Sequence, residues 1–344
     1  MRAVVLGVGA VGSRAARQLA SSAEVESVVV SDREPGRADA VAASLGPVAS
    51  AEPWHGAVLD SADVLVIAAP LATSLASLAP ARASGAIGFD VVEGALASGV
   101  SVVTVADGMT EVEGLLRLDG VARSTAASLV IGAGMAPGLT DVLARQGAAR
   151  FEAVEEIHVA KAGTGGPACA RQHHRALGEE ALDWRDGDWA RRPGGSGREL
   201  CWFPDPLGGQ DCYRAGMADA LLLAPAFPNV RRVTARTAAT RRDRLTAALP
   251  MLRRPHPEGE VGGVRVEVRG QRSGSRDVTV LGAIDRPGVA GGAVAAVSAL
   301  WAAGGRFRRA GAGGLAELVD EAGPFLAELA RRGVKAAAFR GTGG

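Results

Sequence analysis

The chain is poor in cysteine and in lysine, and each scarcity bears on the class of protein. Its 344 residues contain only three cysteines, Cys169, Cys201 and Cys212, and none of them forms a C-x-x-C pair. An odd number of such cysteines gives no sign of a disulfide framework or of a zinc site. Lysine is almost absent, because Lys161 and Lys335 are the only two. Since alanine and glycine are abundant, we interpret the many arginines as a compositional bias and not as a recognition surface.

Charge and hydrophobic patterning exclude further classes. The formal net charge is +1, which gives no electrostatic basis for binding nucleic acid or an acidic membrane. No uninterrupted apolar run reaches the roughly 18 residues typical of a membrane-spanning helix. The apolar segment at the start is short and interrupted by glycines, unlike a signal peptide. We therefore expect a cytoplasmic protein, and its length fits two domains.

The N-terminus carries the most informative motif. Residues 2–6 are typical of a short strand, and Gly7-Val8-Gly9-Ala10-Val11-Gly12 leads from it into a helix that opens at Ser13. This is G-x-G-x-x-G in its required setting, with a strand before it and a helix after it. Gly7 permits the tight turn, Gly9 lets the backbone approach a pyrophosphate, and Gly12 lets helix and strand pack closely. Ala10 and Val11 complete the loop, and the helix N-terminus presents N–H groups to the phosphates.

The next strand ends at the residue that would hold the adenosine ribose. Residues 25–31 form this strand, and Asp32 follows it about 20 residues beyond the glycines. Asp32 would repel a 2′-phosphate and favours NAD. Arg33 could instead stack on adenine, pair with the 2′-phosphate of NADP, or lie in solvent. We expect NAD or NADP, with NAD favoured, and the other predicted cofactor contacts are Ala68, Ala69, Pro70 and Ala106.

The order of patterns predicts an α/β protein with two main units. Strand and helix patterns alternate through the first 130 residues, which indicates a parallel sheet. Its further strands are expected at 63–69, 86–89, 100–106 and 128–132, and its helices at 37–45, 71–78, 91–98 and 112–123. We therefore predict a Rossmann dinucleotide-binding domain over residues 1–132.

After Ala133 the alternation stops and the strands look antiparallel. Strands are expected at 154–160, 230–237, 264–269 and 278–283, helices at 139–149 and 245–252, and a tight turn at Asp186-Gly187. These patterns predict a second, α+β domain with a mixed or antiparallel sheet over residues 133–285. A long alanine-rich helix from Pro287 to about Ala303, two short helices and a strand at 334–339 make up residues 286–344.

One turn between the two units resembles a known family. Gly134-Met135-Ala136-Pro137-Gly138-Leu139 joins a strand to a helix, and this G-x-x-P-G-[LM] pattern resembles the saccharopine dehydrogenase family, the lysine 6-dehydrogenase-like branch above all. Further similar stretches are residues 99–107, 165–167, 202–208, 226–230, 293–304 and 325–334. The chain departs from the family in its shorter length, in Val103 where an aromatic is usual, and at residues 171–175. The resemblance thus carries over fold and cofactor, but not the substrate.

The resemblance implies both an architecture and a reaction. It implies a mixed sheet in the second domain, a substrate cleft between the domains, final helices that pack back towards the first domain, and a homodimer. Members oxidise or reduce a C–N bond, with hydride passing to or from nicotinamide. The substrate would be a small amine, an amino acid or an imine derived from one. Two alternatives stay open: a dinucleotide-binding sensor or scaffold without turnover, and a reductive-condensation enzyme similar to homospermidine synthase.

Such a reaction needs a general acid/base near the nitrogen and a cation for a substrate carboxylate. Asp107 follows the carboxyl end of a predicted parallel strand, where ligand crevices form, although it could instead cap the next helix. His173 and His174 lie between Arg171 and Arg175 in a predicted loop, and histidine titrates near physiological pH. We predict them as acid/base groups and the two arginines as carboxylate anchors. The alternative is a solvated basic helix end.

The remaining candidates are single residues. Lys161 ends a strand predicted to face the cleft, and it could act in catalysis or lie on the surface. Arg214 could form an anion site, and Met135, Pro137 and Gly138 of the family-like turn are assigned to the substrate. We expect no metal site, because adjacent histidines diverge on a helix and the sequence shows no third ligand.

Overall fold

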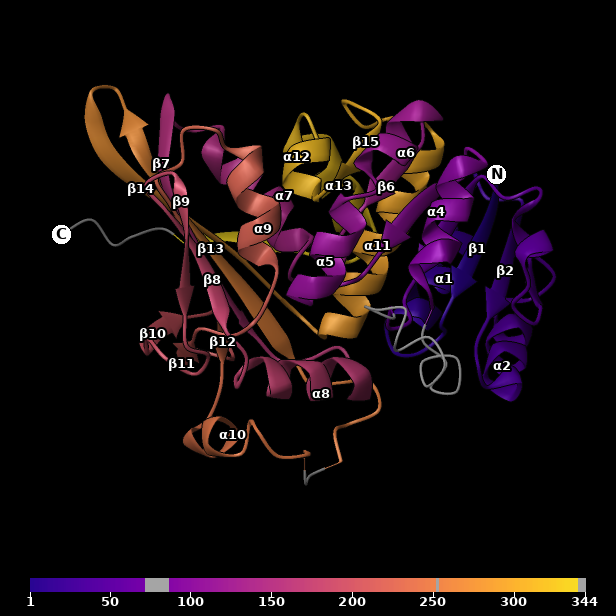
Figure 1. Ribbon diagram of the computed structural model, residues 1–344, viewed down its shortest axis with the longest axis horizontal. Coiled ribbons are helices and arrows are strands. Elements are labelled where there is room, and N and C mark those ends of the chain that lie inside the picture. The colour runs from indigo at the N-terminus through magenta and orange to yellow at the C-terminus, as the bar shows by residue number, and fades with distance from the viewer. Residues whose placement is uncertain (72–86, 252–253, 340–344) are drawn as a thin grey trace.

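The computed structural model describes residues 1–71, 87–251 and 254–339. It contains two β-sheets, one built mainly from residues 2–130 at the right of Figure 1 and one built mainly from residues 153–285 at the left, with helices between them. The predicted fold class, a Rossmann-like unit followed by a unit with a mixed sheet, is confirmed. The helix expected at 71–78 falls almost wholly outside the described residues.

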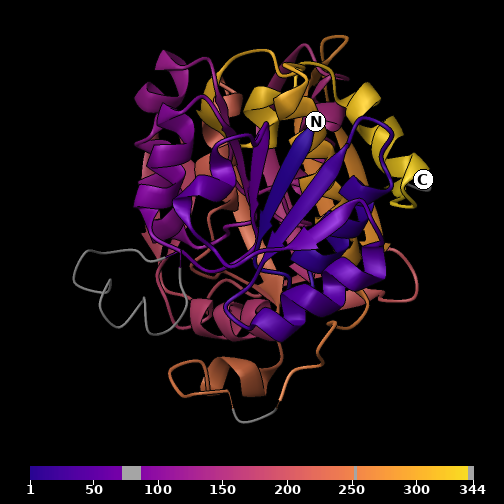
Figure 2. The ribbon, with the colours of Figure 1, turned by 90° about the vertical axis from the view of Figure 1, so that its right-hand side faces the viewer.

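The first sheet is parallel throughout its described pairings, with the order β15-β6-β5-β4-β1-β2-β3 (Figure 2). Its strands are β1 (Arg2–Leu6), β2 (Ser27–Ser31), β3 (Ala49–Ala51), β4 (Val64–Ile67), β5 (Ser101–Thr104), β6 (Ser128–Val130) and β15 (Gly311–Gly313). The central strands β1, β4 and β5 are almost fully buried, as a parallel sheet covered on both faces requires. The strand order reverses between β1 and β4, and the ligand crevice of such a sheet lies at the carboxyl ends of these strands.

The helices of this unit show two corrections. They are α1 (Gly12–Ala20), α2 (Pro35–Leu45), α4 (Phe89–Ala97), α5 (Met109–Leu116) and α6 (Asp119–Ser124), with a short 3-10 helix at Gly56–Leu59. The single helix expected at 112–123 is therefore two helices. The strand expected at 86–89 is also wrong, because Phe89 begins α4 and Ile87 forms only an isolated bridge with Leu71.

The second sheet is mixed, as predicted. Its path is β10-β11-β12-β7-β13-β14-β16, in which only the β12–β7 pairing is parallel, and the β8–β9 hairpin joins it through β12. The strands are β7 (Ala153–Ala162), β8 (Ala181–Arg185), β9 (Asp188–Arg192), β10 (Glu199–Trp202), β11 (Gly209–Tyr213), β12 (Arg232–Ala238), β13 (Gly262–Arg272), β14 (Ser275–Asp285) and β16 (Ala336–Phe339). The helices α7 (Leu139–Ala148) and α9 (Asp219–Leu223) pack against this sheet.

Two segments of the second unit differ from the prediction. The helix expected at 245–252 is α10 (Arg241–Leu245), because Thr240 and Asp243 form a capping box that starts it earlier. Pro250 would also break a helix that continued to residue 252. The expected loop at 165–175 is mostly helix α8 (Pro167–Ala176), which begins with a proline in its first turn.

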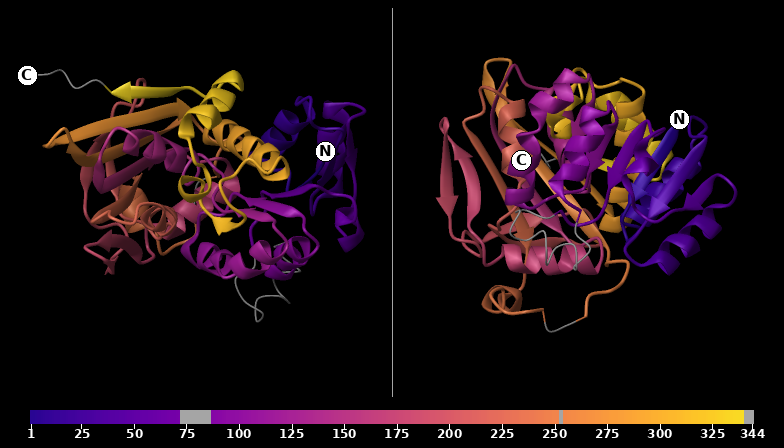
Figure 3. Two further views of the ribbon diagram at one scale, coloured as in Figure 1. Left: turned by 90° about the horizontal axis from the view of Figure 1, so that it is seen from above. Right: turned by 45° about the vertical axis from the view of Figure 1, so that its right-hand side comes forward.

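The C-terminal segment contributes to both units. The predicted helix from Pro287 is confirmed as α11 (Pro287–Ala303), which is buried along most of its length and packs against α1, β4 and β5. The helices α12 (Leu315–Leu318) and α13 (Ala322–Arg331) pack against α7. Strand β15 extends the first sheet, whereas β16, the yellow arrow near the C-terminus in Figure 3, pairs with β14. Among the described residues, no helix is long and apolar enough to cross a membrane.

Candidate active site

The glycine-rich loop between β1 and α1 has the geometry that a pyrophosphate requires. Gly7 has φ of 85°, and a Cβ there would lie 2.9 Å from Cβ of Ala69 at the end of β4. A Cβ on Gly12 would overlap the carbonyl oxygen of Gly7, so helix and loop approach closely only because Gly12 lacks one. Gly9 is exposed, and a Cβ there would meet nothing within 4 Å. The loop therefore offers open backbone beside the N-terminus of α1.

Asp32 ties the end of β2 to this loop. Its Oδ2 accepts a hydrogen bond of 2.9 Å from the Val8 N–H, and its Oδ1 accepts one of 3.0 Å from the Glu34 N–H. Arg37 lies 3.5 Å from the same carboxylate, whose side chain is only 6% exposed. The neighbouring Arg33 is 61% exposed. The carboxylate thus stands at the carboxyl edge of the sheet, beside the glycine-rich loop.

The second unit lies directly on the loop. A Cβ on Gly165 would lie 3.3 Å from Cγ2 of Val11, and one on Gly166 would lie 2.8 Å from Cβ of Ala10. These two glycines precede α8, so the helix starts against the predicted cofactor loop. Groups on the first turns of α8 therefore face the carboxyl edge of the first sheet.

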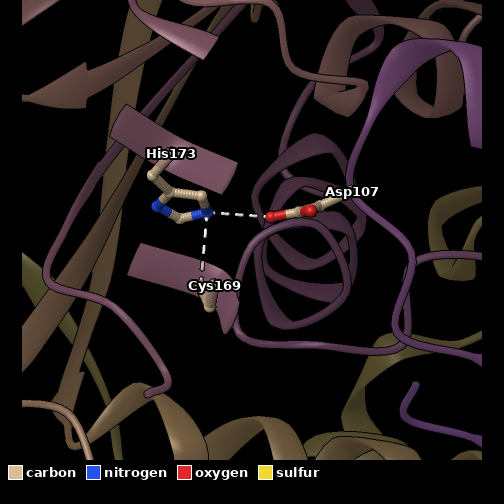
Figure 4. A group of neighbouring side chains, drawn as sticks. All are labelled: Asp107, Cys169 and His173. Atoms are coloured by element: carbon tan, nitrogen blue, oxygen red, sulfur yellow. Dashed lines mark hydrogen bonds and ion pairs between the residues drawn. The ribbon is translucent and has the colours of Figure 1, made fainter. Parts of the chain in front are cut away.

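Three side chains from these two units meet in one cluster (Figure 4). Asp107, three positions after β5, places Oδ2 2.8 Å from Nε2 of His173 on α8. Sγ of Cys169 lies 3.5 Å from the same nitrogen. The side chains of His173 and Asp107 are 10% and 13% exposed. We call Asp107, Cys169 and His173 the β5–α8 cluster.

Sequence reasoning gave Cys169 no role in a site. The available signal was its spacing, because Cys169 and His173 are four residues apart and so share one face of a helix. Treating the segment as a loop hid that signal. The structure brings Asp107 and His173 together, as two of the four predicted catalytic residues.

The cluster is strongly polarised. Burial raises the pKa of Asp107, but the hydrogen bond and positive charge of His173 outweigh it and lower the pKa below its ordinary value. For His173, burial disfavours the charged imidazolium and so acts to lower the pKa. The Cys169 sulfur and the Asp107 carboxylate overcome that effect and raise the pKa to about 9.

Lys161 lies near the cluster and is held by other groups. It is 4% exposed on β7, and its Nζ donates a 2.9 Å hydrogen bond to the carbonyl oxygen of Ala136. The same Nζ lies 3.6 Å from Oδ2 of the fully buried Asp219. Its charge also acts on Asp107 and His173. The turn residues predicted to contact substrate, Met135, Pro137 and Gly138, are all buried.

Glu111 is a residue that sequence reasoning missed. It lies in the first turn of α5, one helical turn after Asp107, and its Oε1 accepts a 3.1 Å hydrogen bond from the Leu71 N–H. Burial, together with the negative charge of Asp107, raises the pKa of Glu111 to about 7. Its signal in the sequence was an acid four positions after Asp107.

The other predicted residues of α8 are not members of the cluster, although the charge of Arg175 acts on the neighbouring Glu111. His174 is buried, and its Nε2 donates a 2.9 Å hydrogen bond to the carbonyl oxygen of Thr246, which lies just beyond α10. Arg171 and Arg175 are exposed. Successive residues of a helix point about 100° apart, so His173 and His174 cannot both face Asp107.

Arg214 belongs to a different part of the second unit. It forms a 2.8 Å ion pair with Asp183 of β8. Both residues line a cavity of about 290 Å³ that also contains Arg185, Arg192 and Arg232. The lining of this cavity includes no member of the β5–α8 cluster. The structure therefore does not bring Arg214 into the cluster.

Comparisons with known proteins agree with this architecture. Residues 3–81 match the model of the TrkA-N domain. A search of curated proteins found no match to the chain. Among solved structures, apo saccharopine dehydrogenase (L-Glu forming) from Saccharomyces cerevisiae is 16% identical with a TM-score of 0.68, over 98% of this chain and all of that one. Amine dehydrogenase from Mycobacterium smegmatis is 15% identical with a TM-score of 0.50, over 92% of this chain and 96% of that one.

These matches define the class of fold. The chain is an α/β protein with an N-terminal Rossmann-like unit and a mixed-sheet second unit. In particular it has the fold of saccharopine dehydrogenase over 98% of its length, as the family-like turn at 134–139 predicted.

Proposed function

We propose that the chain is an NAD(P)-dependent oxidoreductase that acts on a C–N bond of a small amine or amino acid. The observation that carries this proposal is the buried Asp107–His173 pair beyond the carboxyl end of β5. A dinucleotide on such a sheet extends along the carboxyl edge, from Asp32 over the glycine-rich loop towards β4 and β5. Ala68, Ala69 and Pro70 follow β4, and Ala106 follows β5, so we expect these residues to line this path. The nicotinamide would therefore lie beside the cluster.

The reaction needs few protein groups. Oxidation of an amine to an imine moves a hydride from carbon to nicotinamide and releases a proton from nitrogen. Because the cofactor carries the hydride, the protein must position the substrate and stabilise the nitrogen as its proton leaves. The β5–α8 cluster is the buried polar group placed for that task, and one of the matched structures is by name an amine dehydrogenase.

A sensor or scaffold without turnover is the alternative from another class. Such a protein could use the glycine-rich loop, but it has no need for titratable side chains converging at the nicotinamide end of the sheet. The close contact of Asp107 with His173, at 2.8 Å and largely out of solvent, favours turnover.

The Asp32 carboxylate favours NAD over NADP. It is fixed at the end of β2 by two backbone N–H groups, where a 2′-phosphate would meet its negative charge. Two cations beside it favour NADP: Arg33, the next residue, and Arg37, 3.5 Å from the Asp32 carboxylate.

A paired substrate panel tests this proposal. Each small amine or amino acid is supplied with NAD or NADP beside the alcohol or hydroxy acid of the same carbon skeleton, and reduced nicotinamide is measured. We expect turnover with amines only, and at least about tenfold higher kcat/KM with NAD, which corresponds to about 1.4 kcal/mol. Turnover confined to alcohols would contradict the C–N assignment. A tenfold preference for NADP would show that Arg33 and not Asp32 governs the cofactor.

A further inference from the structure

We infer that the β5–α8 cluster binds one divalent cation of the zinc type. Asp107 offers a carboxylate oxygen, Cys169 a sulfur and His173 a ring nitrogen, and these three atoms all lie within 4.8 Å of one another (Figure 4). Asp107 follows β5, whereas the other two residues lie on α8, so the three ligands come together only when the chain is folded.

Two of the three ligand separations are close to those of a tetrahedral site. Bonds of about 2.0 Å to nitrogen and oxygen and about 2.3 Å to sulfur place tetrahedral ligands about 3.3 Å apart for N and O, and about 3.5 Å apart for N and S. The observed separations are 2.8 Å from His173 Nε2 to Asp107 Oδ2, and 3.5 Å from Nε2 to Cys169 Sγ. A shift of about 0.5 Å by the Asp107 carboxylate would therefore bring its separation from Nε2 to the tetrahedral value. The third separation, from the Asp107 oxygen to the Cys169 sulfur, is at most 4.8 Å.

The arrangement is that of a ligand set and not of a proton relay. In a relay, the carboxylate holds one ring nitrogen of the histidine while the nucleophile contacts the other. Here Asp107 and Cys169 both contact Nε2. Nδ1 of His173 is buried without a hydrogen-bond partner among the described residues. All three donor atoms thus lie within 4.8 Å of one another.

The chemistry of the donors selects the cation. Thiolate and imidazole suit zinc and similar transition metals, whereas magnesium and calcium prefer oxygen ligands alone. Three protein ligands also leave the fourth tetrahedral position to solvent or substrate, as catalytic zinc sites do.

The surrounding charges are compatible with a cation. Asp107 and a Cys169 thiolate supply two negative charges, and Glu111 lies close enough to act on Asp107. The opposing charge is Lys161, whose Nζ is held by the Ala136 carbonyl and paired at 3.6 Å with Asp219. Arg175, also on α8, is exposed.

The use of this cation rests on the proposed function, although its binding does not. The open position would take the nitrogen of the amine substrate, and the nitrogen lone pair would bind the cation there. This deepens the assignment of the cluster as the group that stabilises the substrate nitrogen.

The test uses the full chain without substrate or dinucleotide. The protein is stripped with a chelator, dialysed against zinc and then against buffer, and its metal content is measured. We expect one zinc per chain, a raised Tm, and thiolate-to-cobalt absorption when cobalt replaces zinc. Cys169→Ser and His173→Ala should each weaken zinc binding by more than about 100-fold, beyond the usual cost of losing an outer-sphere partner. Cys201→Ser, the same change at a thiol on β10, should keep one zinc per chain.

The outcomes separate the site from the proposed function. Wild type that holds neither zinc nor cobalt, or Cys169→Ser and His173→Ala variants that bind as tightly as Cys201→Ser, would overturn the inference. Circular dichroism establishes that each variant is folded. Dinucleotide titration of the same samples tests the proposed function independently. A chain that binds zinc but no dinucleotide would contradict the proposed function and leave the zinc site standing.

Discussion

Gly9→Asp should abolish dinucleotide binding while leaving the fold intact. Gly9 is exposed and a side chain there meets nothing within 4 Å, so the folded protein accommodates the new carboxylate. That carboxylate would occupy the space over the loop and repel the pyrophosphate. We expect the affinity for NADH to fall at least about 100-fold, or about 2.7 kcal/mol, measured by calorimetric titration.

Gly94→Asp is the matched control. Gly94 is also exposed and free of neighbours, but it lies on α4, away from the glycine-rich loop. This variant should bind NADH as wild type does. Equal affinity in both variants and in wild type would remove the glycine-rich loop from the cofactor site.

His173→Ala should lower kcat by about 10²–10⁴-fold, because it disrupts the cluster that we propose stabilises the substrate nitrogen while its proton leaves. The change removes the side chain that Asp107 and Cys169 both contact, whereas the glycine-rich loop and Asp32 are untouched. We therefore expect the Kd for NADH to stay within about twofold, and the loss to appear once a substrate is supplied from the amine panel.

His55→Ala serves as the comparison, because His55 is an exposed histidine of the first unit outside the cluster. It should retain wild-type kcat. A His173→Ala variant with kcat within threefold of wild type would show that the cluster takes no part in turnover. His173→Gln keeps a polar side chain of similar length. It therefore separates the loss of the imidazole from a loss of packing in the cluster.

Much of the fold was accessible from local patterns. The glycine-rich loop, the apolar strands of the first sheet and the helix at Pro287–Ala303 each carry their signal within a few neighbouring residues. Asp107 was found because the end of a parallel strand is a predictable place for a ligand group. Such features depend on backbone sterics and on the spacing of hydrophobic residues. Both can be read from one short stretch of sequence.

The cluster itself depends on contacts between residues that are far apart in the sequence. Asp107 and His173 are 66 residues apart, and they meet because α8 packs at the end of β5. The same long-range packing directs His173 and His174 to different partners, although the sequence analysis predicted the same acid/base role for both. It also pairs Arg214 with Asp183, away from the cluster, and buries Lys161 beside Asp219.

A crystal structure of the chain with NAD bound would test the proposed reaction site directly. We expect the pyrophosphate over Gly9 at the N-terminus of α1, the adenosine ribose at Asp32, and the nicotinamide ring against Asp107 and His173. A nicotinamide ring that lies away from the β5–α8 cluster, with the cluster shielded from it by protein, would contradict the proposed reaction site.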